Sequence, residues 1–201
     1  MKGATSMEGG RRGMRAVVMT WLLVVFAAHA PASGLEELAI PPESVKAAFL
    51  FRFADYVEWP AASSPGVPFV IAVLGEPAVA AELRRILPGR SLQGRNVVVH
   101  ELTQIQDLEN PDLEGPDILY LGVETKGALA RAVAAAIRIH RPLLVVSNAT
   151  DGLAAGAAIN FVTRDSRIRF EVSPAAAHAT GVKLSSRLYG VAVRVVGTPQ
   201  N

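Results

Sequence analysis

The chain has 201 residues, of which 50% are hydrophobic and 19% are charged, and this composition excludes an intrinsically disordered protein. It contains 20 Lys and Arg against 18 Asp and Glu, so its charge is nearly balanced. It has no cysteine, which excludes disulfides, thiol catalysis, cysteine-bound metal and redox switching at cysteine.

Residues 1–32 have the pattern of a secretion signal. A basic stretch precedes 13 uncharged apolar residues, 16–28, which are too few to span a membrane because a span needs about 20. Cleavage is predicted before Ser33, after Ala30-Pro31-Ala32. An uncleaved N-terminal anchor is the alternative interpretation. The basic residues of the stretch are Arg11, Arg12 and Arg15.

Cleavage would change the charge of the protein. The signal segment holds four basic residues and one acidic residue, so the other 169 residues carry 16 basic and 17 acidic side chains, a net charge of −1. That balance leaves no electrostatic footprint for nucleic acid and no basic cluster for a membrane surface. We expect a single exported domain over residues 33–201, in a bacterial periplasm, held together by packing alone.

The exported part is predicted to begin with a helix over residues 42–58. Proline is tolerated in the first turn of a helix, and Pro41-Pro42 stands at this start. Pro60 ends the helix. The apolar residues expected on one face of it are Val45, Phe49, Phe53 and Tyr56.

Strands and helices then alternate along the chain, which favours a largely parallel sheet with helices on both faces. Residues 103–115 are polar and are expected to form a short helix or a surface loop. The predicted strands are residues 69–74, 97–100, 117–121 and 142–147, and the predicted helices are residues 77–87 and 126–139.

The C-terminal part predicts a hairpin and a last helix. Residues 158–163 and 168–172 flank Arg164-Asp165-Ser166-Arg167, a hairpin pattern. The last helix is expected over 174–188, and 191–196 are predicted to be a final strand or an extension of that helix. The predicted fold class is therefore α/β: a mixed, largely parallel sheet flanked by helices on both faces, with an antiparallel edge hairpin.

The sequence offers no pattern for catalysis. It has no G-x-S-x-G, no phosphate-binding loop and no H-E-x-x-H. After the signal segment its histidines are His100, His140 and His178, which lie 40 and 38 residues apart, and no pair has the spacing of metal ligands. We therefore predict no catalytic residue, no metal site and no cofactor.

A location for a small-molecule pocket follows from the predicted fold. Ligands in open α/β sheets bind beyond the carboxyl ends of the strands. Four residues are expected there: Gly75, Gly122, Ser147 and Asn148. Glu76 would repel a phosphate, so Gly75-Glu76-Pro77 is predicted to be an ordinary strand-to-helix turn.

Partner binding is predicted at two places. In the strand 168–172, Arg169 and Glu171 alternate with apolar residues, which predicts one buried face and one face that shows the Arg–Glu pair. The hairpin is either an edge protected by its charge or an interaction surface. Trp59 either packs on the core or anchors a partner. From side-chain type and expected exposure, the candidate partner-binding residues are Trp59, Arg169, Glu171 and Arg187.

Three blocks of the sequence are similar to a known family. The first is 45–60, which ends in Trp59-Pro60, and the second is 69–75 with the later turn Leu92-Gln93-Gly94-Arg95. The third runs through 143–147, 158–161, 168–172 and 175–188 and includes Leu184-Ser185-Ser186-Arg187-Leu188. In order and spacing the chain resembles the YfiR-like family of periplasmic proteins over about residues 43–196.

The resemblance implies a regulator without enzymatic activity. It implies binding to, and repression of, the periplasmic sensor domain of a membrane diguanylate cyclase, where release of repression raises cyclic di-GMP and promotes biofilm formation. Redox control through disulfides, associated with the best-known member, cannot operate in a chain without cysteine. The alternative is a periplasmic module that binds a small molecule for another inner-membrane sensor, such as a histidine kinase. A homodimer is the other assembly considered.

Overall fold

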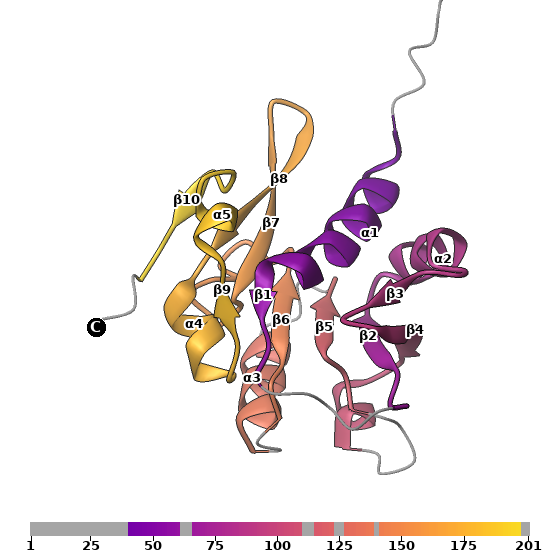
Figure 1. The fold of residues 1–201 in the computed structure, drawn as a ribbon. Coiled ribbons are helices and arrows are strands. Elements are labelled where there is room, and N and C mark those ends of the chain that lie inside the picture. Colours follow the sequence, from indigo (N-terminus) through magenta and orange to yellow (C-terminus); the bar gives the residue numbers. More distant parts are fainter. Residues whose placement is uncertain (1–39, 61–65, 110–114, 123–126, 139–140, 198–201) are drawn as a thin grey trace, which may run out of the picture. The chain divides into compact units, whose positions relative to one another are not determined.

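The computed structural model describes residues 40–60, 66–109, 115–122, 127–138 and 141–197, and Figure 1 shows their fold. The predicted signal segment lies outside the described residues, as does His140. The strands are β1 (Val57–Glu58), β2 (Phe69–Leu74), β3 (Ser91–Leu92), β4 (Arg95–Leu102), β5 (Ile118–Leu121), β6 (Leu144–Ser147), β7 (Ile159–Arg164), β8 (Arg167–Val172), β9 (Lys183–Leu184) and β10 (Arg194–Val195). The helices are α1 (Pro42–Phe53), α2 (Pro77–Ile86), α3 (Ala128–Arg138), α4 (Pro174–Ala179) and α5 (Ser186–Tyr189), with the 3-10 turns η1 (Ala54–Tyr56) and η2 (Ile105–Glu109). In the described part of the chain, no helix combines the length and the apolar character that a membrane crossing requires.

The body of the described chain is an eight-stranded sheet in the order β10-β8-β7-β6-β5-β2-β4-β3. Strands β4, β2, β5, β6 and β7 are parallel to one another, whereas β8 runs antiparallel to β7 and β3 to β4. Numbered along the chain, the five parallel strands stand in the order 2-1-3-4-5 of a doubly wound α/β protein. Strands β1 and β9 form a separate antiparallel pair. The predicted α/β class with a mixed, largely parallel sheet is confirmed.

The central strands β2, β5 and β6 are buried on both faces, and β2 shows why its sequence is apolar throughout. Ile71 and Val73 belong to a core shared with α1, α2 and α4, whereas Ala72 and Leu74 belong to a second core that includes α3. Because successive side chains of a strand point to opposite faces, a strand covered on both sides needs apolar residues at every position. The helices therefore lie on both faces of the sheet, as predicted (Figure 1).

Aromatic rings join α1 to the base of the β7–β8 hairpin. The ring of Phe53 stacks on Phe161 at 5.8 Å between centroids and meets Phe170 edge-on at 5.1 Å. Phe49 contacts both hairpin rings from the previous turn of α1. Such pairs contribute about 0.5–1.5 kcal/mol each beyond their buried area. Of the face predicted for this helix, only Phe53 is fully buried, because the helix turns Ala47 and Leu50 inward instead.

Two predicted helices are shorter than expected because tertiary pairing competes with them. Helix α1 ends at Phe53, and Val57 pairs with Leu184 across the β1–β9 ribbon. The helix predicted over 174–188 is divided into α4, β9 and α5. Gly181 has φ of +78°, a left-handed conformation that ends α4.

The antiparallel hairpin is not the edge of the sheet. Strand β10 lies beyond β8 and runs parallel to it, with Arg194 beside Glu171 and Val195 beside Val172. Of the two alternatives for residues 191–196, the structure contains the strand. The segment from Val193 to Val196 follows β8 through two backbone hydrogen bonds, from Val193 N to Phe170 O and from Val196 N to Val172 O, both 2.9 Å.

Candidate partner-binding surface

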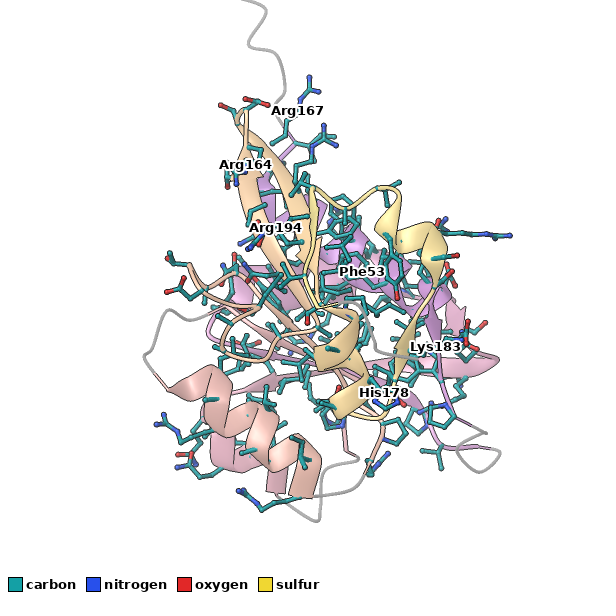
Figure 2. All side chains as sticks on the ribbon, turned by 90° about the vertical axis from the view of Figure 1, so that its left-hand side faces the viewer. Phe53, Arg164, Arg167, His178, Lys183 and Arg194 are labelled. Atoms are coloured by element: carbon teal, nitrogen blue, oxygen red, sulfur yellow. The ribbon has the colours of Figure 1, made fainter. Side chains whose placement is uncertain are left out.

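One face of the β7–β8–β10 end of the sheet is rich in arginine. Arg164 stands opposite Arg167 across the hairpin turn, and Val162 stands opposite Arg169. Residues directly opposite in a ladder share a face, and so do residues two apart along a strand. Arg194 joins this face through its register with Glu171. We call the set Arg164, Arg167, Arg169 and Arg194 the arginine face; Figure 2 labels Arg164 and Arg167 on the hairpin and Arg194 below them.

The arginine face lies on the same side of the sheet as α3 but beyond the core that α3 covers. Asn160 shares this face and bonds to Ser147 of β6, whose neighbour two positions back, Val145, belongs to the α3 core. No residue of β7, β8 or β10 belongs to that core in the described chain. The guanidinium groups are therefore presented to solvent.

Three of the four arginines lack an acidic partner. Arg164, Arg167 and Arg169 are exposed and form no ion pair with any residue that the structure describes. Arg164 and Arg167 face each other across the ladder, and like charges in such positions destabilise the pairing of the two strands. A basic surface that costs stability is a candidate for binding an acidic partner.

Glu171 corrects the expectation of an exposed Arg–Glu pair on β8. It is only 5% exposed, and its carboxylate accepts a hydrogen bond from Arg194 Nη2 at 2.6 Å instead of pairing with Arg169. The carboxylate raises the pKa of the Arg194 guanidinium above its ordinary value through this hydrogen bond. The difference arises because β10, not solvent, lies next to β8 at this position. Glu171 therefore holds an arginine of the surface in place.

The segment next to the arginine face exposes apolar side chains. Val191, Val193, Val195 and Val196, which we call the valine strip, are 65%, 45%, 41% and 38% exposed. Val195 belongs to β10, the outermost strand at this end of the sheet, and the other three valines flank that strand in the sequence. An exposed apolar group next to a free strand edge is typical of an interaction site. Sequence reasoning had considered this segment only for its secondary structure, and it overlooked Arg194.

The other two candidate residues lie in different surroundings. Arg187 is exposed on α5, the helix that precedes β10 in the chain. Trp59 is half-buried: its ring meets Phe69 edge-on at 5.4 Å, and its Nε1 donates to the Ala54 carbonyl at 3.3 Å. It therefore packs on the core and also keeps an accessible side.

Trp59 does not join the hairpin arginines. It lines a surface hollow of about 330 Å³ together with His178 and Lys183. Figure 2 shows these two residues well below Arg164 and Arg167, away from the tip of the hairpin. The structure therefore does not gather the four candidates into one patch.

The location predicted for a pocket holds a polar cluster of the protein's own side chains. Glu76 stands two residues after the end of β2, and its Oε1 accepts a hydrogen bond from Lys46 Nζ of α1 at 2.6 Å. Its other oxygen, Oε2, accepts hydrogen bonds from the Tyr120 hydroxyl and from Asn148 Nδ2. Burial, followed by the neighbouring carboxylate, raises the pKa of Tyr120. We call Lys46, Glu76, Tyr120 and Asn148 the switch-point cluster, because β2 and β5 lead away to opposite sides of the sheet here.

The switch-point cluster is closely packed. A Cβ on Gly122 would lie 2.5 Å from Glu76 Cβ, so only glycine fits after β5. Asn148 Oδ1 is buried and has no hydrogen-bond partner among the described residues. Gly75, Gly122, Ser147 and Asn148 thus lie where the sequence predicted them. Sequence reasoning missed the contacts of Lys46, Glu76 and Tyr120, although a lysine between apolar helix residues was a signal.

The described residues offer no cluster of side chains suited to a metal ion. They contain no group of three His, Asp or Glu side chains arranged to hold a metal ion. His178 is exposed on α4, and His100 is half-buried on β4. The arrangement as a whole offers surfaces for recognition.

Comparison with known families identifies the chain. Residues 43–193 match the model of the YfiR/HmsC-like family. The chain belongs to this family. Members of the YfiR/HmsC-like family are regulatory, non-catalytic proteins. The family match spans α1 to the residues just before β10, so it includes the hairpin and most of the switch-point surroundings.

Solved structures show more distant similarity to this YfiR/HmsC-like chain. A conserved domain protein from Vibrio cholerae is 14% identical with a TM-score of 0.48, and the match covers 78% of this chain. An ABC domain from Streptococcus pneumonia, in complex with L-Trp, is 10% identical with a TM-score of 0.47, and the match covers 77% of this chain. The chain spans 60% of the length of each. No curated protein matches the sequence.

Proposed function

We propose that this chain is an exported regulator that binds, and represses, the periplasmic sensor domain of a membrane diguanylate cyclase. The observation that carries the proposal is membership of the YfiR/HmsC-like family over residues 43–193. The pattern of residues 1–32 supports export. Repression needs no bond chemistry: it needs higher affinity for the inactive state of the partner than for the active one.

The arginine face and the valine strip support this proposal physically. Arg164, Arg167 and Arg169, which are exposed and have no acidic partner in the part of the chain that the structure describes, attract an acidic partner, and exposed valines provide apolar area to bury. Arg169 and Arg187 are proposed as partner-binding residues near this end of the sheet, and Trp59 as one at a separate contact. A coupling free energy of about 1–3 kcal/mol between docking and cyclase activity would shift the equilibrium of the cyclase by about 5- to 150-fold.

Co-expression tests the proposal with the full chain. The chain, with its own leader, is produced in a bacterium together with the membrane diguanylate cyclase encoded nearest to it, and cellular cyclic di-GMP is measured. We expect the chain to lower cyclic di-GMP, to be recovered from the periplasmic fraction, and to co-purify with the sensor domain. A chain that is retained in the cytoplasm, or that leaves cyclic di-GMP unchanged while the cyclase is active, would overturn it.

A second candidate function is small-molecule sensing at the switch-point cluster. It is favoured by the buried, unpartnered Asn148 Oδ1 at the place where doubly wound sheets bind ligands. A thermal-shift screen of metabolites tests it, since a ligand at 100 times its dissociation constant stabilises by about 2.7 kcal/mol. Stabilisation that disappears in Asn148→Leu would support this function, and an unchanged melting temperature across the screen would reject it.

A further inference from the structure

The edge of β10 has a free side. Strand β10 is the last in the order of the sheet, and the described chain places no strand beyond it. Its other side is fixed to β8 by the hydrogen bonds of Val193 and Val196. Alternate peptide groups of a strand point to opposite sides, so some peptide groups of this segment point away from β8. They form a template on which another extended chain can add.

The two faces that meet at this edge differ in chemistry. Arg194 belongs to the arginine face because it stands in register with the carboxylate of Glu171. Val193 and Val195 lie on the other face, since side chains alternate along a strand. A strand next to β10 would therefore present its side chains alternately to arginines and to valines.

The charge of the arginine face defines what such a strand must carry. Arg164, Arg167 and Arg169 have no acidic partner in the described chain, and the carboxylate of Glu171 is already bound to Arg194. Arg169 lies on β8, so two strand spacings of about 5 Å each separate it from a strand added beyond β10, a distance that an arginine and a glutamate side chain extended toward each other can span. Residues that point to this face should therefore be acidic, and those between them apolar.

We propose that an extended segment of the partner, in which acidic residues alternate with apolar ones, adds to β10 as a further strand of the sheet. This inference rests on the proposed function, since it names the chemistry by which the regulator holds its partner. The main-chain bonds provide a template that tolerates many sequences, while the alternation determines which segments fit. Docking of this kind also covers the valine strip.

Three labelled peptides test strand addition on the full chain by fluorescence anisotropy. The first alternates Glu and Val over eight residues, the second has the same composition in two blocks, and the third is the alternating peptide N-methylated at every second residue. We expect the block peptide and the N-methylated peptide to bind at least tenfold more weakly than the first. Equal binding of all three would show adhesion by charge alone and overturn the proposal.

Variants locate the site. Arg169→Glu and Val195→Asp, both at exposed positions, are expected to weaken binding of the alternating peptide at least tenfold. The matched control is Arg131→Glu at an exposed position of α3, which should bind as the unchanged chain does. An equal loss of peptide affinity in the control, or no loss in the two site variants, would contradict the proposed location of the site.

The same variants separate this inference from the proposed function. If the cyclase sensor domain binds Val195→Asp as tightly as it binds the unchanged chain, strand addition is wrong and the proposed function stands. If no sensor domain binds the chain but the alternating peptide does, the proposed function is wrong and the edge remains a strand-binding site.

Discussion

At the scale of single residues, two polar centres mark opposite ends of the parallel strands. At the amino ends, the Arg95 guanidinium forms two hydrogen bonds with Asp117, at 2.9 and 2.8 Å, and Asp117 also accepts from Val70 N. At the carboxyl ends, Lys46 and Glu76 pair within the switch-point cluster. Each centre joins segments that lie far apart in the sequence, so each fixes tertiary structure rather than a local turn.

Replacing Lys46 by methionine is expected to destabilise the protein. The Lys46 and Glu76 side chains are 10% and 24% exposed, so loss of the ammonium group leaves a largely buried carboxylate without its counter-charge. Because Glu76 retains some contact with water, we expect a loss of about 2–3 kcal/mol, below that for a fully buried pair. Urea unfolding followed by circular dichroism measures it.

The double variant Lys46→Met/Glu76→Gln is the control for that prediction. It removes both charges and retains an oxygen that accepts from the Tyr120 hydroxyl. We expect it to recover most of the stability that the single variant loses. A single variant as stable as the unchanged chain would show that the ion pair contributes nothing.

The raised pKa of Tyr120 predicts that the folded protein loses stability in alkaline solution. Burial and Glu76 raise the pKa of its hydroxyl in the folded state above the ordinary value of about 10. The folded state therefore holds this proton more tightly than the unfolded state, so the stabilisation is complete below about pH 10 and is lost as the pH rises above it. Unfolding of the unchanged chain and of Tyr120→Phe should be compared between pH 8 and 11.5.

The expected result is a difference in unfolding free energy between the two proteins that is constant up to about pH 9.5 and shrinks above it. Tyr120→Phe lacks the hydroxyl, so its own decline over this range reports the other groups of the protein. A difference that stays constant to pH 11.5 would contradict the assignment.

At the scale of elements, the β7–β8 hairpin carries the arginines on a turn of unusual geometry. Asp165 and Ser166 both have positive φ, 49° and 57°, as the two central residues of a type I′ turn require. This turn follows the right-handed twist of the two strands. The residues present tolerate the conformation less well than Asn-Gly would, and the six-residue ladder and the ring contacts at the base of the hairpin add to its stability.

Ser166→Gly is expected to stabilise the hairpin. Glycine adopts positive φ without steric cost, and we expect the free energy of unfolding to rise by about 0.5 kcal/mol. Thermal unfolding measures the change. The control Thr163→Gly lies on β7 just before the turn. It should lower the free energy of unfolding by about 1 kcal/mol, because glycine makes the unfolded chain more flexible and relieves no positive φ at this position. Equal destabilisation by both substitutions would contradict the I′ turn.

At the scale of the whole molecule, the charge is nearly balanced but unevenly distributed. The exported part is expected to have a net charge of −1, whereas one face at the end of the sheet carries four arginines and a single neutralised carboxylate. Local charge of this kind accelerates association with an oppositely charged surface, and salt screens it over about 8–10 Å.

Association with the sensor domain is therefore expected to depend on salt. Between 50 and 500 mM NaCl, the association rate should fall about tenfold, while the dissociation rate changes little. Stopped-flow or surface-based kinetics measures both rates. In the triple variant Arg164→Gln/Arg167→Gln/Arg169→Gln, the association rate should lose most of its salt dependence. A triple variant with the salt dependence of the unchanged chain would place the electrostatic contact elsewhere.

Much of the fold could be predicted from the sequence because local patterns report it. The apolar run 69–74 predicted β2 to the residue, and the turn chemistry of 164–167 predicted the hairpin. Helices ended early wherever a distant segment competed for the backbone, as Leu184 does at Val57. No local pattern contains that competition, since the two residues are brought together only by folding.

The candidate surface shows the same division. The sequence by itself determined the class of fold, the absence of cysteine chemistry and the arginine-rich hairpin, because composition and alternation are local properties. Only the tertiary structure decided that Glu171 is buried and bound to Arg194, that Arg164, Arg167 and Arg169 have no acidic partner among the described residues, and that Lys46 reaches Glu76. The reason is physical: the environment of a charge is set by the segments packed around it, and these come from remote parts of the chain.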